Sequence, residues 1–183
     1  LFKMKIFNFI VLLLFAFSVE AQETFLNNSF AVRDFFLKKD SIFLIEKRDV
    51  KYFNYSKENS PIQSYFIGGY GLEIFDDSEN NEIITVSNEF NRTVSTLRFF
   101  NKSSKKVEHV YYYHEGKSID ALILPELKYA AMSLNNNKII IVNYTKKPSF
   151  KVEHEIQLKA MARRLIYKND FLFYVTDLGE IYK

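Results

Sequence analysis

The feature that most constrains this chain is the regular return of short β-rich segments. Segments that begin at Ile42, Ile83, Tyr129 and Phe171 start 41, 46 and 42 residues apart, and each is followed after a polar turn by a second apolar segment. Their Val, Ile, Tyr and Phe content, with Asn, Asp, Lys and Ser between them, is typical of strands joined by hairpins. The recurrence predicts an all-β fold built from repeated units of about 40 to 50 residues.

Two further patterns follow the same period. The tetrapeptide Lys-Val-Glu-His occurs at 106–109 and again at 151–154, 45 residues later, and both copies follow a turn rich in Lys and in Ser or Thr. Apolar segments near 32–37, 72–75 and 119–124 precede three of the four segment starts. Each unit is therefore expected to hold four strands, with the tetrapeptide in the outer one. We predict a partial β-propeller of four-stranded antiparallel blades, about 3.5 to 4 in number.

The burial pattern favours stacked sheets over a sheet with one wet face. Residues 138–142, Lys-Ile-Ile-Ile-Val, are apolar on both alternating faces, so a strand there must be covered on both sides. Two stretches, 124–134 and 158–165, also carry apolar residues at helical spacing, and helices there would make the fold α+β. We predict strands in both stretches, because they occupy positions where the repeat requires strands.

Residues 3–21 have the pattern of an export signal. Lys3 and Lys5 precede an apolar run from Phe9 to Phe17, and a small-residue site, Val19-Glu20-Ala21, follows. A membrane-spanning helix needs about 20 apolar residues, so this shorter run favours a cleaved signal over a membrane anchor. The sequence predicts a signal peptide over 1–21, a β-propeller-like repeat domain over 22–183, and a secreted, periplasmic or cell-surface location.

Composition removes several classes of function. The 183 residues include no Cys and no Trp, which excludes thiolate zinc sites, iron–sulfur clusters and a Cys nucleophile. Removal of the signal would leave 23 Lys and Arg against 21 Asp and Glu, a charge of +2. This near-neutral balance argues against a nucleic-acid partner, since such proteins carry a concentrated basic field. No cofactor is expected.

One stretch resembles a known propeller repeat. Residues 86–97, Val-Ser-Asn-Glu-Phe-Asn-Arg-Thr-Val-Ser-Thr-Leu, are similar to the YVTN-type repeat, in which Tyr-Val-Thr-Asn, a polar turn and Thr-Val-Ser-Val-Ile follow one another. Residues 174–177, Tyr-Val-Thr-Asp, resemble the same opening, whereas the WD dipeptide of WD40-like repeats is absent. The resemblance, clearest at 83–97 and 171–182, implies an exported or surface-associated binding module, and some propellers of similar shape are lactonase-like hydrolases.

The length bears on how such a fold would be completed. At about 43 residues per unit, residues 22–183 supply fewer than four blades, near the lower end of the usual four to eight. We therefore expect a fragment of a larger propeller, with self-association through an open blade edge as the alternative.

The expected function is protein or glycan binding through the rim loops, as an exported scaffold module with an extracellular partner. The alternative is a fragment of a lactonase-like propeller hydrolase, and a remnant without independent activity is a third possibility. A hydrolase needs polar, acidic or His side chains on the innermost strands. The segments expected there, 35–37, 72–75 and 122–124, are mostly apolar, which favours binding over catalysis.

Two groups of residues invite a metal interpretation, and for each a structural role is preferred. His109 and His154 sit at matching repeat positions, and one blade spacing of about 10 Å is too long for one shared ion. Residues 76–82, Asp-Asp-Ser-Glu-Asn-Asn-Glu, offer oxygen ligands at alternate positions, as calcium loops do, but lack the Gly and the closing Glu. We interpret them as a hairpin turn and assign no catalytic, cofactor-binding or metal-ligating residue.

Three further motifs have both a functional and a structural explanation. Residues 68–71, Gly-Gly-Tyr-Gly, are interpreted as a blade-to-blade turn that uses positive φ rather than as a phosphate cradle. Residues 111–114, Tyr-Tyr-Tyr-His, are expected to pack in the core rather than to stack on a ligand. Lysines at 102–106 and 146–147 occupy equivalent hairpins, where they would line one rim and favour acidic partners, or simply maintain solubility.

Overall fold

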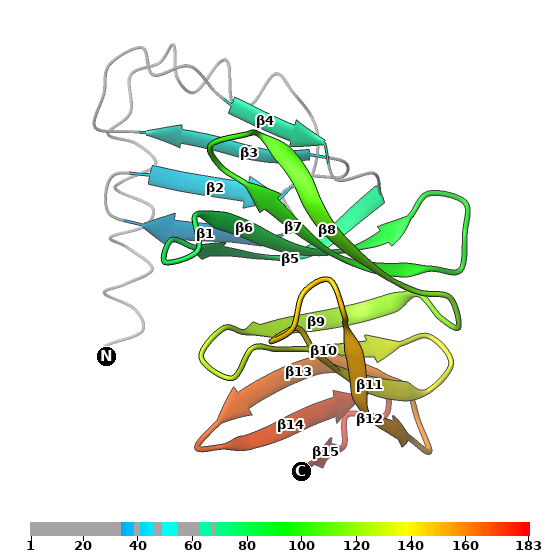
Figure 1. The fold of residues 1–183 in the computed structure, drawn as a ribbon. Helices are drawn as coiled ribbons and strands as arrows, with labels where there is room; N and C mark the ends of the chain where they lie inside the picture. The colour runs from blue at the N-terminus through cyan, green and yellow to red at the C-terminus, as the bar shows by residue number, and fades with distance from the viewer. Residues whose placement is uncertain (1–33, 39–40, 46–48, 55–62, 67–68) are drawn as a thin grey trace, which may run out of the picture. The chain divides into compact units, whose positions relative to one another are not determined.

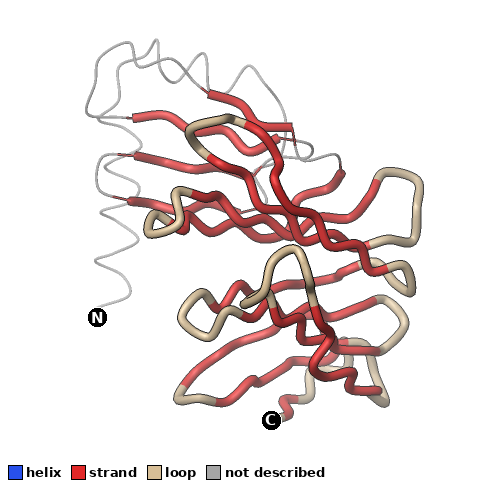
Figure 2. The backbone as a smooth tube through the Cα atoms, in the orientation of Figure 1, coloured by secondary structure: helices blue, strands red, loops and turns tan. Residues whose placement is uncertain are grey.

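A computed structural model describes residues 34–38, 41–45, 49–54, 63–66 and 69–183, so the predicted signal peptide over 1–21 lies outside the described residues. These residues form fifteen strands and contain no helix (Figure 2). In chain order the strands are β1 (Asp34–Lys38), β2 (Ser41–Ile45), β3 (Asp49–Asn54), β4 (Gln63–Phe66), β5 (Gly69–Asp77), β6 (Glu82–Glu89), β7 (Ser95–Asn101), β8 (Lys106–Tyr113), β9 (Ser118–Leu124), β10 (Tyr129–Leu134), β11 (Lys138–Asn143), β12 (Lys151–Gln157), β13 (Ala162–Lys168), β14 (Phe171–Thr176) and β15 (Ile181–Tyr182).

The strands form four antiparallel sheets, and within each sheet the strands lie side by side in chain order. The first sheet holds β1 to β4, the second β5 to β8, the third β9 to β12, and the fourth β13 to β15 (Figure 1). The predicted segment starts at Ile42, Ile83, Tyr129 and Phe171 all fall in the second strand of a sheet. The four-stranded unit predicted from the spacing is confirmed in the first three sheets, whereas the fourth sheet has three strands.

Apolar clusters join successive sheets, and consecutive residues of one strand contribute to the clusters on its two opposite faces. In β6, Ile83 packs in a cluster with the first sheet, whereas its neighbour Ile84 packs in a cluster with the third. In β11, Ile139 packs toward the fourth sheet and Ile140 toward the second. These four side chains are essentially inaccessible to solvent, and burying each contributes about 1.5 to 3 kcal/mol. The prediction that residues 138–142 are covered on both faces is confirmed.

The two stretches with helical spacing are not helices. Residues 124–134 comprise the end of β9, a turn and β10, and residues 158–165 comprise a connection and most of β13. Ala131 and Met132 explain the ambiguity, because both are fully buried, one against the fourth sheet and the other against the second. A strand covered on both faces carries apolar residues at consecutive positions, and such a run contains helical spacing by accident.

Turn placement decides where a binding surface can form. In an antiparallel meander, alternate turns lie at the same end of the sheet, so the β5–β6 and β7–β8 turns share one end, as do the β9–β10 and β11–β12 turns. Ion pairs between the second and third sheets show that both sets lie at the same end. We call this end, made of residues 77–82, 101–106, 124–129 and 143–151, the charged rim.

Candidate functional site

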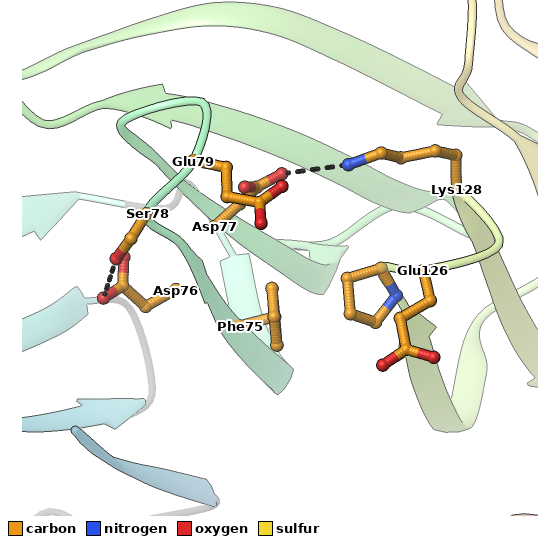
Figure 3. A pocket seen from close by; sticks show the side chains of 8 residues that line it. Phe75, Asp76, Asp77, Ser78, Glu79, Glu126 and Lys128 are labelled. Carbon is orange, nitrogen blue, oxygen red and sulfur yellow. Dashed lines mark hydrogen bonds and ion pairs between the residues drawn. The ribbon is translucent and has the colours of Figure 1, made fainter.

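A pocket of about 390 Å³ opens on the charged rim between the second and third sheets (Figure 3). The end of β5 and the β5–β6 turn line one side of it, and the β9–β10 turn lines the other. Its lining residues are Phe75, Asp76, Asp77, Ser78, Glu79, Pro125, Glu126 and Lys128. The pocket therefore joins turns that lie about 50 residues apart in the sequence, a distance close to one repeat unit.

The β5–β6 turn is built by local side-chain hydrogen bonds. Asp77 Oδ1 accepts from the backbone N–H of Asn80 at 3.2 Å, and Asp77 Oδ2 accepts from Asn80 Nδ2 at 2.8 Å. Asn81 then adopts a φ of 55°, which Asn tolerates better than most residues. The interpretation of residues 76–82 as a hairpin turn is confirmed. Among the described residues, no group of three or more His, Cys, Asp or Glu side chains is placed to hold a metal ion.

Ion pairs hold this turn against the third sheet and against its own sheet. Lys128 Nζ lies 3.5 Å from Asp77 Oδ2, and in Figure 3 the Lys128 side chain reaches across the pocket toward that carboxylate. Lys102 Nζ lies 2.5 Å from Asp76 Oδ1, and Lys147 pairs with Glu82. The three carboxylates are buried, so these pairs are better shielded from solvent than ordinary surface pairs.

The electrostatic state of Asp77 follows from these contacts. Burial acts to raise the pKa of Asp77, but the hydrogen bonds from Asn80 and the charge of Lys128 outweigh it and hold that pKa below its ordinary value. Asp77 is therefore ionised at neutral pH and already has a positively charged partner.

Two carboxylates at the pocket differ from the rest. Glu79 and Glu126 line the pocket, are exposed to solvent, and make no hydrogen bond or ion pair with any described residue. The lining contains four carboxylates and one ammonium group, and Lys102, beside Asp76, supplies one more positive charge. Among the lining residues and Lys102, the negative charges therefore outnumber the positive charges by two, and Phe75 and Pro125 add apolar surface to the pocket. This arrangement suits a cationic group with an apolar stem.

The predicted lysine rim is present, but its charge is partly neutralised. The turns that carry Lys102 and Lys147 occupy equivalent positions in the second and third sheets, as the repeat predicted. Both lysines are engaged by buried carboxylates, whereas Lys105 and Lys146 are exposed. The idea that this rim favours acidic partners stays a prediction, and the pocket at its centre has the opposite charge.

The repeated tetrapeptide has a structural role. The Lys-Val-Glu-His copies lie in the outer strands β8 and β12, as predicted, and the pairing ladder skips Glu108 in the first copy and Glu153 in the second. Each copy therefore forms a β-bulge, which bends an outer edge and hinders edge-to-edge pairing. His109 and His154 follow these bulges at equivalent positions.

The Gly-rich and Tyr-rich motifs are also structural. Tyr113 is buried between the second and third sheets and Tyr111 packs against the same cluster, so the core-packing interpretation is confirmed for these two residues. Tyr112 and His114 are exposed, and their rings stack on each other. Residues 67–68 connect the first sheet to the second but lie outside the described residues. Positive φ is wrong as the reason for Gly69, because among the described glycines only Gly179 has it. A Cβ at Gly69 would instead lie 1.8 Å from the carbonyl oxygen of Asn88, so close approach of two backbones requires glycine there.

Sequence reasoning missed a buried polar clamp between the second and third sheets. Asn88 Nδ2 donates to the carbonyl of Ser118 at 2.8 Å, and Asn88 Oδ1 accepts from the Ser118 N–H at 2.8 Å. Ser95 Oγ contacts the same N–H at 2.8 Å and donates to the carbonyl of Gly116 at 2.9 Å. Asn88 and Ser95 belong to the YVTN-like stretch, so that motif joins one sheet to the start of the next.

A second buried polar group was also missed. Arg98 in β7 donates to Ser87 Oγ at 2.7 Å and to Thr96 Oγ1 at 2.5 Å, and it pairs with Glu89. Ser87, Thr96 and Arg98 share the face of the second sheet that points away from the third. The sequence did contain a sign of this group, because polar residues occur at alternate positions of both strands. Polar side chains that share one buried face of a sheet must form hydrogen bonds with one another.

Solved structures resemble the described fold. The chain is similar to "Kuenenia stuttgartiensis Hydrazine Synthase" (11% identity, TM-score 0.60, 75% of this chain and 47% of that chain). It is similar to BamB from Moraxella catarrhalis (11% identity, TM-score 0.55, 83% and 44%) and to the Neurospora crassa Pan2 WD40 domain (15% identity, TM-score 0.55, 78% and 41%). The chain has a β-propeller fold. It spans less than half the length of each of these three chains.

The other comparisons add no family. No protein-family model matches the sequence, and a search of curated proteins finds no match either. Within the described residues of the propeller, no helix is long and apolar enough to cross a membrane. At 11 to 15% identity, the solved structures show the propeller fold alone.

Proposed function

We propose that this chain is an exported β-propeller segment that acts as a protein-binding module, and that the rim pocket receives a Lys or Arg side chain of its partner. The observation that carries the proposal is the position of Glu79 and Glu126, two exposed carboxylates beside Phe75 and Pro125 that make no hydrogen bond or ion pair within the part of the chain that the structure describes. Propellers present their turns as a binding surface, and this rim is held in place by buried ion pairs.

The chemistry of the pocket favours a protein partner over a glycan. A Lys or Arg stem can lie on Phe75 and Pro125 while its charge meets Glu79 and Glu126. A neutral sugar would leave both carboxylates without an opposite charge. Glycan binding therefore stays a prediction from the sequence, and so does export, which the pattern of Lys3, Lys5 and the apolar run supports.

The hydrolase alternative receives less support from the described inner strands. Asp120 in β9 is the acidic residue of the innermost strand of the third sheet. Its Oδ2 accepts from the N–H of Leu165 at 2.7 Å, and its Oδ1 lies 3.5 Å from Arg164. Asp120 thus joins the third sheet to the fourth, which is a structural role.

The test uses a dodecapeptide library with arginine at the central position, compared with the same library carrying glutamine there. Fluorescence polarisation at low and high ionic strength measures binding to the full chain. Partly exposed ion pairs are each worth about 0.2 to 1 kcal/mol, so Glu79→Gln and Glu126→Gln should each weaken binding by about 1.5- to 5-fold. Glu108→Gln, an exposed glutamate on β8, is the matched control and should leave affinity unchanged.

Two results would overturn the pocket proposal. Equal binding of the arginine and glutamine libraries would show that no cationic group is recognised. An unchanged affinity in the Glu79→Gln/Glu126→Gln double variant would place any binding elsewhere. Export is tested separately by N-terminal sequencing of the protein from its producing cells, which should begin at Gln22.

A further inference from the structure

Lys128 already occupies part of the rim pocket. Of the described residues that line the pocket, it alone carries a positive charge. Its side chain enters from the β9–β10 turn and crosses the pocket toward Asp77 on the opposite wall (Figure 3). A cationic side chain of a partner would enter the same space and meet the same carboxylate. Lys128 and the partner's cation therefore compete for Asp77.

The ion pair of Lys128 is easier to open than its neighbours on the charged rim. Its Nζ lies 3.5 Å from Asp77 Oδ2, whereas Lys102 Nζ lies 2.5 Å from Asp76 Oδ1. The side chain of Lys128 is 36% exposed, against 23% for Lys102 and 21% for Lys147. A longer and more exposed pair costs less to separate, because water screens the attraction and solvates both groups as they part.

Asp77 keeps other partners when Lys128 moves away. The backbone N–H and the side-chain amide of Asn80 donate to its two oxygens, at 3.2 and 2.8 Å. Burial raises the pKa of Asp77, and each of these two hydrogen bonds opposes that effect more strongly than the charge of Lys128 does. Asp77 can therefore exchange one cation for another without rebuilding its turn.

The backbone of Lys128 is held in place, so the exchange requires a movement of the side chain alone. Its N–H donates to the carbonyl of Pro125 at 3.2 Å, and its carbonyl accepts from the N–H of Tyr144 at 2.9 Å. The pair between Lys147 and Glu82 joins the second and third sheets independently of Lys128. Displacement of the ammonium group thus leaves both walls of the pocket where they are.

We propose that the Lys128 side chain is a built-in competitor of the partner, and that a cationic side chain binds by displacing the Lys128 ammonium group from Asp77. This inference rests on the proposed function, because it concerns the same pocket. The apparent affinity is then the intrinsic affinity multiplied by the fraction of chains in which the pair is open. A partly exposed pair shifts such an equilibrium by about 1.5- to 5-fold, so the open fraction is about 0.2 to 0.4.

Lys128→Gln removes the competitor. It should raise the affinity of the full chain for dodecapeptide libraries with arginine or lysine at the central position by about 2.5- to 6-fold, measured by fluorescence polarisation. Lys128→Arg keeps the charge but can donate two N–H bonds to Asp77, so it should lower both affinities. A simple effect of net charge would leave the affinities of Lys128→Arg unchanged.

Lys105→Gln is the matched control. Lys105 is exposed on the same rim and has a φ of 55°, against 57° for Lys128, but it does not line the pocket. Its loss should change the affinity for either library by less than about 1.5-fold at physiological ionic strength, because salt screens distant charges. Lys128→Gln and Lys105→Gln should also have the same midpoint of urea denaturation.

The displacement itself can be observed by NMR. Reductive methylation with isotope-labelled formaldehyde gives each lysine a signal, and the signals missing from Lys128→Gln and Lys105→Gln assign these two residues. Titration of the wild-type chain with N-acetyl-arginine methylamide should move the Lys128 signal toward the position of the exposed Lys105, which should itself stay unchanged.

The outcomes separate the competition from the proposed function. Equal affinities of the wild type and Lys128→Gln for an arginine library that both prefer to the glutamine library would refute the competition and leave the function standing. A Lys128 signal that stays fixed during the titration, or a lower urea midpoint in Lys128→Gln than in Lys105→Gln, would also refute it. If neither chain prefers arginine to glutamine, both ideas fail. A preference that appears only in Lys128→Gln would support the competition and contradict the function proposed for the unmodified pocket.

Discussion

The clamp between the second and third sheets makes a quantitative prediction. Asn88→Ala removes two buried hydrogen bonds to Ser118, one to its N–H and one to its carbonyl, both at 2.8 Å. The Ser118 N–H keeps Ser95 Oγ as an acceptor, whereas its carbonyl loses the amide donor. Each lost bond costs about 1 kcal/mol, and a buried carbonyl left without its donor adds about 1 kcal/mol more.

The free energy of unfolding should therefore fall by about 2 to 3 kcal/mol in Asn88→Ala. For a chain of this size, that loss lowers the Tm by about 4 to 12 °C. Urea denaturation followed by circular dichroism measures the change. Hydrogen exchange should show faster exchange at the start of β9, because the clamp holds Ser118, its first residue.

Asn135→Ala is the matched control. Asn135 Oδ1 also accepts a backbone N–H next to β9, that of Lys117 at 3.0 Å, but this contact is exposed to solvent. It should cost less than about 1 kcal/mol, since water replaces the lost acceptor. Equal losses in Asn88→Ala and Asn135→Ala would refute the reasoning, because it attributes the larger loss to burial and to the second bond, which Asn88 makes with the Ser118 carbonyl.

Two further predictions concern backbone contact and pH. Gly69→Ala should lower the free energy of unfolding by about 3 kcal/mol or more, since the added methyl group meets a backbone carbonyl rather than a flexible side chain. Gly179→Ala is the comparison, because its added methyl group meets nothing within 4 Å and only its φ of 79° is unfavourable. Gly179→Ala should cost only about 1 to 2 kcal/mol, and urea denaturation measures both changes. Burial, and then the charge of Glu155, raise the pKa of Tyr113 to about 12 in the folded chain. In the unfolded chain the phenol has its ordinary pKa near 10, so between about pH 10 and 12 it is ionised in the unfolded chain and still protonated in the folded chain. Stability should fall by up to about 2 kcal/mol between pH 10 and 12, and Tyr113→Phe should remove that part of the alkaline loss; an unchanged pH profile in the variant would contradict the assignment.

The arrangement of strands could be predicted because propeller sheets repeat local patterns. The starts at Ile42, Ile83, Tyr129 and Phe171 mark equivalent strands, since a repeated unit places similar residues at similar positions. The choice of strands over helices near Ala130 and Met161 depended on the same period. Positive φ at Gly69 was wrong, because the requirement at that position comes from Asn88, a residue 19 positions away that the local sequence does not reveal.

The rim pocket could not be predicted in the same way. Its two walls, the β5–β6 and β9–β10 turns, come from different repeat units, and no short motif connects Glu79 to Glu126. Asp77 was interpreted as a turn residue, which it is, but its ion pair with Lys128 depends on how two sheets stack. The clamp was partly visible, because Asn88 and Ser95 lie in the YVTN-like stretch, while their common partner Ser118 does not.

The sequence by itself determined the all-β class, the four-strand unit, the positions of the turns and the double burial of the central strands. These properties depend on alternation and spacing within about 45 residues, which a linear pattern records directly. Only the tertiary structure decided which carboxylates are neutralised and which remain open at the pocket. Those properties depend on distances between side chains from different sheets. Such contacts do not appear as a repeating pattern in the amino-acid sequence.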